Sequence, residues 1–268
     1  MSDWLQAIIL GVIEGLTEFL PVSSTGHMII AMPWLGVDGS KPPWPAFLYF
    51  IQIGAIAAVV LYFWRRLWRQ VLTRPSGGLH NHLIVKLVVG VLPATAVGLP
   101  LNDWVEASFE KPLPVAIALV LGAVVMIVIE RRCRKTTGPR IEEVTVRQAF
   151  LIGVAQCVSI IPGTSRAMAT IFGGLLVGLP AATAAEFSFY LAIPTICGAG
   201  LVRLLKDSAT LTSENATVLG VGFASSFLVA WLVIAAFMRY VQTRPLQPFA
   251  IYRIFLGAAV LASWWLAG

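Results

Sequence analysis

The stretch that decides the fold reads Glu14-Gly-Leu-Thr-Glu18-Phe-Leu-Pro21-Val-Ser-Ser-Thr-Gly-His27. It lies inside an otherwise apolar segment, residues 4–32, in which Pro21 and the hydroxyl residues after it interrupt a continuous helix. Non-helical backbone at membrane depth is tolerated only where protein or a polar cavity surrounds it. We therefore expect residues 4–32 to enter and leave the membrane on one side, as a re-entrant helical hairpin.

The rest of the chain indicates a polytopic membrane protein. Its 268 residues are 58% hydrophobic and 12% charged, whereas a soluble domain has roughly 25% charged residues. We predict an all-α fold with six transmembrane helices in a single membrane domain, residues 1–268. Six apolar runs are long enough to cross a hydrocarbon core of about 30 Å, namely Ala46–Trp64, His82–Leu101, Leu113–Ile129, Ala184–Leu205, Ala216–Met238 and Phe249–Ala267.

The basic residues predict the orientation of these spans. The formal net charge is +6, and arginine and lysine gather in three connections, residues 65–74, 131–147 and 239–244. Short cytoplasmic loops carry such an excess, so we expect these three connections on the cytoplasmic side of a multi-pass membrane protein. A nucleic-acid partner is not expected, because the positions of the charges already explain them.

A second broken segment, residues 148–180, resembles the first. Gln6–Val12 matches Gln148–Val154, and Pro21–Ser24 parallels Pro162–Ser165 with a one-residue offset. Three spans follow each copy, and because three is odd, the second copy and its re-entrant hairpin must enter from the opposite side. We therefore predict an inverted-topology repeat, with repeat 1 over about 4–130 and repeat 2 over about 147–267. Transporters use this architecture and bind their substrates at the repeat interface.

Two glutamates inside the first segment need an explanation, since ionisable groups within a membrane are costly. Glu14 and Glu18 are four residues apart and would share one face of a helix. Their repulsion is relieved if a divalent cation such as Mg²⁺ or Ca²⁺ lies between them. It is also relieved if one carboxyl group holds a proton. Alternatively, one carboxylate could act as a general base.

The residues after Pro21 suit phosphate chemistry. Ser23, Ser24 and Thr25 offer hydroxyls and backbone N–H groups at a new helix start, where anions bind readily. His27 follows Ser24 by three residues and is a candidate for proton transfer.

The second broken segment supplies a candidate anion-binding group. Arg166 follows Thr164 and Ser165 at the second break, and a guanidinium there matches a phosphate bidentately. The alternative for Arg166 is a salt bridge to Glu14 or Glu18, which would not exclude catalysis.

These motifs resemble the undecaprenyl-diphosphate phosphatase family, the enzymes linked to bacitracin resistance. The resemblance covers nearly the whole chain and is most specific over Glu14–His27. Further matching segments are Pro162–Arg166 with Thr170, Arg147–Phe150, Glu186–Phe189 and Pro248–Arg253. The family usually continues its second motif with serine and glycine, where this chain has Ala167 and Met168.

The resemblance implies hydrolysis of undecaprenyl diphosphate to undecaprenyl phosphate and inorganic phosphate, at a site that opens to the outer, periplasmic side of the cytoplasmic (inner) membrane. By this comparison the catalytic residues are Glu14, Glu18, Ser24, His27 and Arg166, and the glutamates handle a divalent cation or a proton. Whether Ser24 or water attacks stays open. The expected partners are the polyprenyl diphosphate lipid and the bilayer, with a homodimer as a candidate assembly. The alternative function is a polyprenyl-phosphate transporter or flippase, which could also be a second activity. Substrate-binding candidates are Ser23, Thr25, Thr164, Ser165 and Arg166.

Overall fold

The computed structural model describes residues 1–73, 78, 81–109, 111–206 and 215–267, and every regular element within these ranges is helical. The prediction of six long apolar helices is confirmed, because six helices are long and apolar enough to cross a membrane. They are α3 (Trp44–Tyr62), α5 (Leu83–Phe109), α6 (Pro112–Cys133), α9 (Ala181–Lys206), α10 (Ala216–Thr243) and α11 (Gln247–Ala267).

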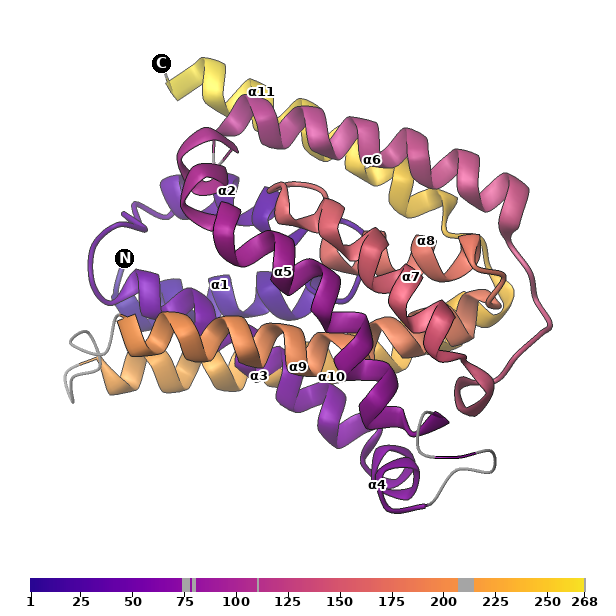
Figure 1. Cartoon of the computed structure of the whole chain (residues 1–268). Coiled ribbons are helices and arrows are strands. Elements are labelled where there is room, and N and C mark those ends of the chain that lie inside the picture. Colours follow the sequence, from indigo (N-terminus) through magenta and orange to yellow (C-terminus); the bar gives the residue numbers. More distant parts are fainter. Residues whose placement is uncertain (74–77, 79–80, 110, 207–214, 268) are drawn as a thin grey trace.

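The helices form three groups (Figure 1). On one side, α6 packs along α11; on the other, α10 packs against α3 and against α1 (Asp3–Thr17). Between them lie the shorter helices α2 (Ser24–Trp34), α7 (Val146–Gln156) and α8 (Arg166–Leu176). A 3-10 turn, Ile141–Glu143, precedes α7, and another, Cys157–Ile160, follows it.

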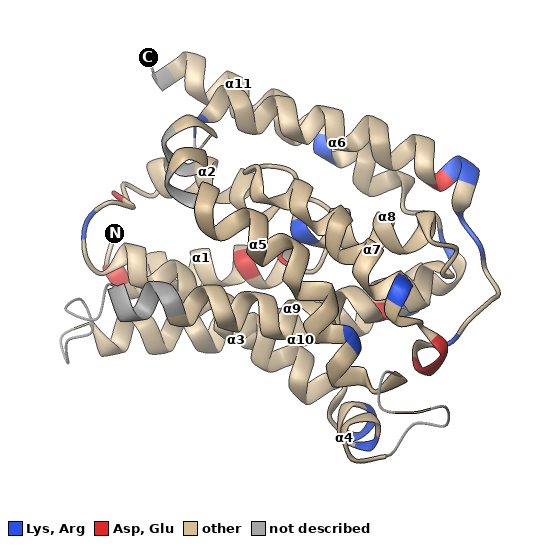
Figure 2. Ribbon diagram, viewed as in Figure 1, with Lys and Arg blue, Asp and Glu red and all other residues tan. Residues whose placement is uncertain are grey.

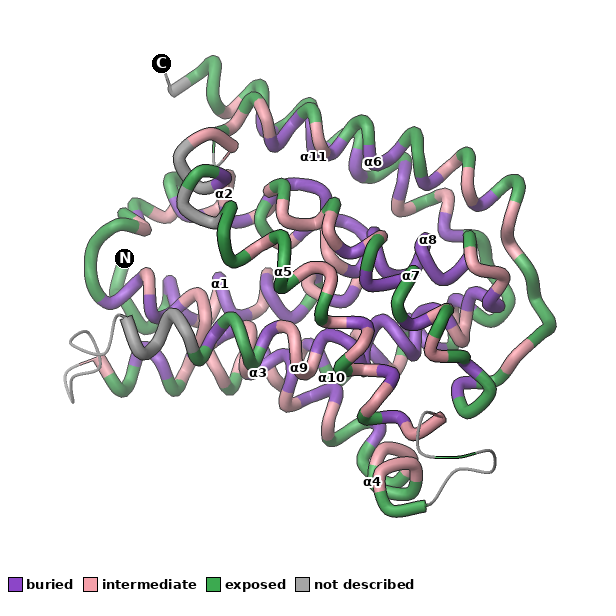
Figure 3. Tube along the Cα trace, in the orientation of Figure 1, coloured by how far each residue is buried: buried purple, intermediate pink, exposed green. Residues whose placement is uncertain are grey.

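The distribution of polar and apolar residues fits a lipid environment. Charged residues are sparse along the long helices (Figure 2), and the outer faces of α6 and α11 are exposed (Figure 3). These faces carry exposed apolar side chains such as Leu121 and Phe255, which are 61% and 70% exposed. Helix α9 is the most enclosed span, since 61% of its most apolar stretch is buried, against 17% for α5. It is therefore a central support for the shorter helices.

Both broken segments are interrupted where the sequence predicts. Helices α1 and α2 have 15 and 11 residues, or about 22 and 16 Å at 1.5 Å per residue, so neither crosses a membrane alone. The pairing of elements is reciprocal, since α1 packs on α10 and α7 on α5, while α2 packs on α11 and α8 on α6. These pairs support the re-entrant hairpins and the inverted repeat, which stay predictions.

Two connections differ from expectation. Helix α5 continues to Phe109, beyond the predicted apolar run His82–Leu101, because Val105 is buried and gives the helix end a packing contact. The first basic connection is also not a loop throughout, since residues 64–72 form helix α4 (Trp64–Leu72). Residue 74 of that connection lies outside the described residues.

Candidate active site

Both broken segments restart with the same local structure. Ser23 and Ser165 precede α2 and α8 with positive φ values of 73° and 75°, which non-glycine residues rarely adopt. Each side chain caps its helix: Ser23 Oγ accepts from the Gly26 N–H at 3.4 Å, and Ser165 Oγ accepts from the Met168 N–H at 3.2 Å. Such sparsely populated conformations cluster at functional sites.

The helix starts also correct the register of the two segments. Ser165 follows Ser23 by 142 residues (165 − 23), which is also the spacing of Gln148 and Gln6 (148 − 6). The one-residue offset was therefore wrong for this part. Its cause was alignment on the prolines, whereas the shared structure is the serine cap. In the corrected register, Ser24 corresponds to Arg166.

Glu18 joins the first segment to the second. Its Oε2 accepts a hydrogen bond from Ser24 Oγ at 2.8 Å, and its Oε1 accepts one from Arg166 Nη2 at 2.9 Å. The Glu18 and Arg166 side chains are only 10% and 11% exposed. A pair so poorly solvated contributes little net stability, which favours a functional reason for it. Three predicted catalytic residues therefore meet at one place, and the alternative salt bridge of Arg166 forms with Glu18.

Arg166 is held from two further sides. Its Nη1 donates to the Ser188 carbonyl of α9 at 3.1 Å, and its guanidinium carbon lies 5.6 Å from the centre of the Phe19 ring. Thr170 Oγ1 and Ser188 Oγ are 2.6 Å apart, which ties α8 to α9. The Arg166 Nε is buried and makes no hydrogen bond within the described residues. The guanidinium is thus oriented and keeps a donor for an anion.

Glu14 lies one helical turn before Glu18 and is 2% exposed. The Glu18 N–H donates to the Glu14 carbonyl at 2.9 Å, so the helical path continues to Glu18. The Glu14 Oε1 is buried and has no hydrogen-bond partner among the described residues. A buried carboxylate without a partner is costly, so this oxygen suits a proton or a cation.

The oxygen atoms at this place fit a small divalent cation. Glu14 offers a free carboxylate oxygen, and the Glu18 carboxylate and the Ser24 hydroxyl lie beside one another. Mg²⁺ is commonly held by one or two carboxylates together with waters and substrate phosphates. In the part of the chain that is described, no group of three or more His, Cys, Asp or Glu side chains gathers. A cation here would therefore depend on water and phosphate for its remaining ligands.

His27 has a partner that the sequence did not predict. Its Nδ1 lies 2.8 Å from the Ser23 carbonyl oxygen, and its Nε2 lies 2.7 Å from the Tyr252 hydroxyl. A carbonyl only accepts, so Nδ1 carries the proton and, in the neutral ring, Nε2 accepts from Tyr252. The two rings also stack, with centroids 5.6 Å apart. Helix α11 therefore orients the candidate proton-transfer residue.

The remaining predicted residues occupy different environments. Ser23 and Ser165 act as helix caps, Thr25 is exposed, and Thr164 is 5% exposed. The carbonyl of Thr164 accepts a hydrogen bond from Arg253 at 2.9 Å. That these four residues bind substrate stays a prediction. Arg253 was missed, although an arginine within the span Phe249–Ala267 is itself a signal.

The two departures from the family motif lie in the core. Ala167 is fully buried and Met168 is 5% exposed, and both belong to the main hydrophobic cluster. Neither side chain contacts the Glu18 carboxylate through a hydrogen bond. These departures therefore concern the packing of α8 more directly than the contacts of Arg166.

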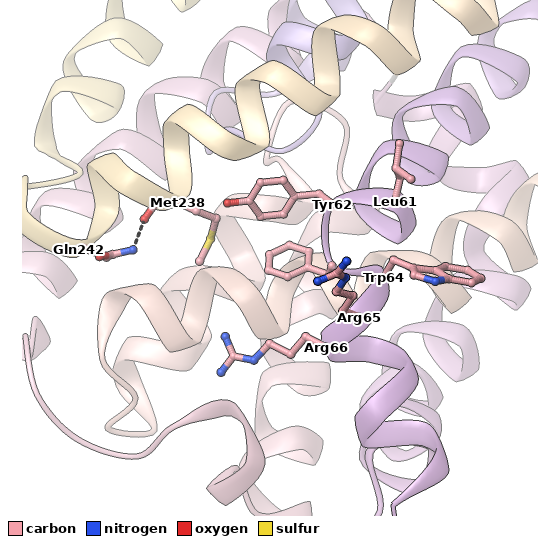
Figure 4. A pocket seen from close by; sticks show the side chains of 8 residues that line it. Leu61, Tyr62, Trp64, Arg65, Arg66, Met238 and Gln242 are labelled. Atoms are coloured by element: carbon pink, nitrogen blue, oxygen red, sulfur yellow. Dashed lines mark hydrogen bonds between the residues drawn. The ribbon is translucent and has the colours of Figure 1, made fainter.

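A cavity of about 620 Å³ lies at the start of α4, apart from the polar cluster (Figure 4). It is lined by the end of α3, the start of α4 and two residues of α10, Met238 and Gln242. The three residues in direct contact, Glu18, Ser24 and Arg166, form the Glu18 cluster. None of them lines this cavity, so the cavity volume does not describe the candidate active site.

Comparison with known proteins gives one consistent result. The family model described as bacitracin resistance protein BacA matches residues 7–259. An undecaprenyl-diphosphatase of Polaromonas naphthalenivorans is 40% identical, covering 97% of this chain and 95% of its own length. Similar proteins of the same name occur in Fusobacterium nucleatum (44% identity, 96% and 98% coverage) and Sorangium cellulosum (47% identity, 96% and 85% coverage).

Proposed function

The chain belongs to the bacitracin resistance protein BacA family, and from this membership and the site's geometry we propose that it is an integral membrane undecaprenyl-diphosphatase. It hydrolyses undecaprenyl diphosphate to undecaprenyl phosphate and inorganic phosphate, which recycles the lipid carrier for cell-wall synthesis. The observation that carries the proposal is the direct contact of Glu18 with both Ser24 and Arg166. The relatives bear an enzyme's name, and the alternative of a polyprenyl-phosphate transporter receives no support from them.

Arg166 binds the diphosphate in this proposal. Its Nε is an unused buried donor, and its Nη2 is committed only to Glu18. A phosphate that enters takes over these donors in the bidentate geometry that guanidinium groups favour. Ser188 keeps the other nitrogen in place, so the terminal phosphorus is brought toward Ser24 without reordering α8.

Glu18 is placed to accept a proton during the attack. The Ser24 hydroxyl already donates to its carboxylate at 2.8 Å. If Ser24 attacks, its Oγ–phosphorus bond forms while the bridging phosphorus–oxygen bond breaks, undecaprenyl phosphate leaves, and water later releases the phosphate. If water attacks, the same bond breaks in one step and Ser24 orients the water. His27 is the candidate that returns a proton, with Tyr252 holding its ring.

Replacing Ser24 with alanine should separate these two routes. Loss of an attacking oxygen should lower turnover about a thousandfold or more, whereas loss of an orienting hydroxyl should lower it about tenfold. Ser40→Ala is the control, since it removes an exposed hydroxyl that is not among the candidate site residues. Near-normal turnover of the Ser24 variant would contradict a serine nucleophile and leave the water route.

A divalent cation, Mg²⁺ or Ca²⁺, is proposed at Glu14 and Glu18. When bound, it would neutralise charge on the phosphate and on the carboxylates. Protein purified in detergent should release phosphate from undecaprenyl diphosphate, should lose at least tenfold of this rate in chelator, and should recover it when Mg²⁺ or Ca²⁺ returns. Glu14→Gln should raise the cation concentration that half-maximal activity requires, because it removes one carboxylate ligand. An active enzyme that is indifferent to chelator would refute the cation but not the phosphatase.

The chain is a multi-pass membrane protein, and we propose the inner membrane, with the site opening to the periplasmic side. The distribution of basic connections supports this orientation. In a variant without the cysteines at positions 133, 157 and 197, a cysteine at Ser40 should react with an impermeant maleimide in intact cells. One at Thr136 should react only after permeabilisation. Both positions are exposed, so the opposite pattern would reverse the orientation. The homodimer and the lack of a nucleic-acid partner stay predictions.

A further inference from the structure

Arg253 of α11 is a fully buried arginine with an unusual set of partners. It is 0% exposed, and none of the ion pairs found in the described residues includes it. Its guanidinium donates to five backbone carbonyl oxygens, of Leu119 (3.2 Å), Pro21 (3.4 Å), Thr164 (2.9 Å), Ala118 (3.2 Å) and Gly163 (3.0 Å).

These carbonyls come from the two helix breaks and from the helix that supports them. Pro21 precedes the Ser23 cap, Gly163 and Thr164 precede the Ser165 cap, and the other two carbonyls belong to α6. Backbone groups at a break lack helical partners and are costly to bury unpaired. One rigid, planar side chain therefore satisfies both breaks and fixes their separation.

We propose that Arg253 is a positioning residue that fixes the position of Ser24 relative to Arg166. Ser24 and Arg166 are the first residues after the two caps, so their relative position follows that of the breaks. Lysine carries the same charge but only three donors on one atom, so it cannot reproduce the fork. Because reacting groups tolerate small displacements poorly, we expect Arg253→Lys to lower kcat/KM about a hundredfold while the protein still folds.

Gly122 offers a second way to disturb the same contact. A methyl group added there would overlap Arg253 Nη2, so Gly122→Ala displaces the guanidinium without removing its charge. Gly220→Ala on α10 is the matched control, because a methyl group there meets no atom within 4 Å. We expect a loss of at least tenfold for the first variant and none for the second.

A double-mutant cycle distinguishes positioning from a merely structural role, and it rests on the proposed phosphatase activity. Arg253→Lys is measured alone and in Arg166→Lys, with phosphate release as the readout. If Arg253 acts through Arg166, its hundredfold effect should shrink to about threefold in the second background. Equal losses in both backgrounds, or full activity of Arg253→Lys and Gly122→Ala, would overturn the inference. An inactive native enzyme would instead refute the proposed function.

A separate observation concerns α4, which is attached to the rest of the protein on two of its sides. Leu67 and Val71 pack against the main core. Arg66 donates to Glu186 Oε2 at 2.9 Å, and Gln70 donates to Glu142 Oε1 at 3.4 Å. Two sides of the helix are thus attached to the protein, and its orientation is set.

The other two sides of α4 are exposed and differ in character. Trp64, Trp68 and Leu72 are 50%, 51% and 71% exposed, and the two indoles stack with centroids 5.3 Å apart. Arg65 is exposed beside them, and Arg69 stays 71% exposed although it lies 4.0 Å from Glu142. Together the five residues form the α4 surface, in which an aromatic stripe adjoins a basic stripe.

We infer that the α4 surface binds the headgroups of anionic phospholipids. Helix α4 begins two residues after the span α3 ends at Tyr62, which places it at the membrane surface. Indole rings prefer headgroup depth and arginines reach lipid phosphates. The cavity beside Trp64 and Arg65 gives a headgroup room (Figure 4).

Native mass spectrometry of the full-length protein with phosphatidylglycerol tests this inference. Each arginine near an anionic lipid contributes about 1 kcal/mol, or roughly fivefold in affinity. Arg65→Gln/Arg69→Gln should therefore raise the apparent Kd of the first bound lipid about 25-fold, and phosphatidylcholine binding should not change. Arg131→Gln/Arg132→Gln removes the same charge from exposed positions on α6 and should have much less effect. An unchanged Kd, or an equal rise in both double variants, would overturn the inference.

Discussion

Replacing Arg166 with alanine should lower phosphate release from undecaprenyl diphosphate about a thousandfold, because removal of one preorganised group from a phosphoryl-transfer site commonly has an effect of this size. Within the Glu18 cluster, whose three residues are all described, only Arg166 carries a positive charge. Its loss leaves the diphosphate without its guanidinium and leaves the buried Glu18 carboxylate without its positively charged partner. Phosphate release in detergent at saturating and subsaturating substrate would measure both kcat and KM.

The conservative variant Arg166→Lys provides the control. It keeps the charge but loses the bidentate geometry and the contact with Ser188, so an intermediate loss of about a hundredfold is expected. The thermal unfolding of both variants should also be measured in detergent, because a buried carboxylate without a charged partner costs about 3 kcal/mol of stability. If the alanine variant kept activity within threefold of the native enzyme, Arg166 could not be the diphosphate-binding residue.

The Glu18→Gln variant should lose activity to a similar extent, by about a thousandfold, for a different reason. The amide can still occupy the space between Ser24 and Arg166, but it cannot accept the proton that Ser24 donates at 2.8 Å. Loss of a general base alone contributes about a hundredfold to a ten-thousandfold. The measurement is the single-turnover rate of phosphate release, which isolates the chemical step from product release.

Two further variants give this prediction its controls. Glu18→Asp keeps the charge with a shorter reach and should retain part of the activity. The double variant Glu18→Gln/Arg166→Met removes both charges, so it should recover much of the stability lost in either single variant while staying inactive. A fully active Glu18→Gln enzyme would show that Glu18 does not accept the proton, and Glu14 would become the candidate general base.

Much of the fold could be predicted from residues that act locally. The six spans follow from runs of apolar residues, since the width of a membrane sets a length that sequence alone can meet. The interruptions near Pro21 and Pro162 are equally local, because proline removes a backbone donor wherever it stands. Helix α4 was missed as a helix because its basic residues were interpreted only through their charge. The available signal was the spacing of Trp64 and Trp68, which are four residues apart and therefore lie on one face of a helix.

The candidate site was predictable in its members but not in its contacts. Glu14, Glu18, Ser24, His27 and Arg166 are conspicuous in sequence because polar groups inside apolar segments are costly. Their order along the chain does not say which glutamate meets Arg166, since both lie on the same helical face. Packing decides this: Glu18 receives both Ser24 and Arg166, while Glu14 keeps a buried oxygen without a partner.

By itself, therefore, the sequence determined that this protein is a helical membrane protein with two broken segments and a phosphate-suited polar cluster. Only the tertiary structure decided that Tyr252 holds His27 across 225 residues and that Arg253 joins the two breaks. The physical reason is the range of the forces involved. Hydrophobic length and helix interruption depend on neighbours along the chain, whereas a hydrogen bond requires two groups within about 3 Å, which only the packing of α11 against α2 and α6 provides.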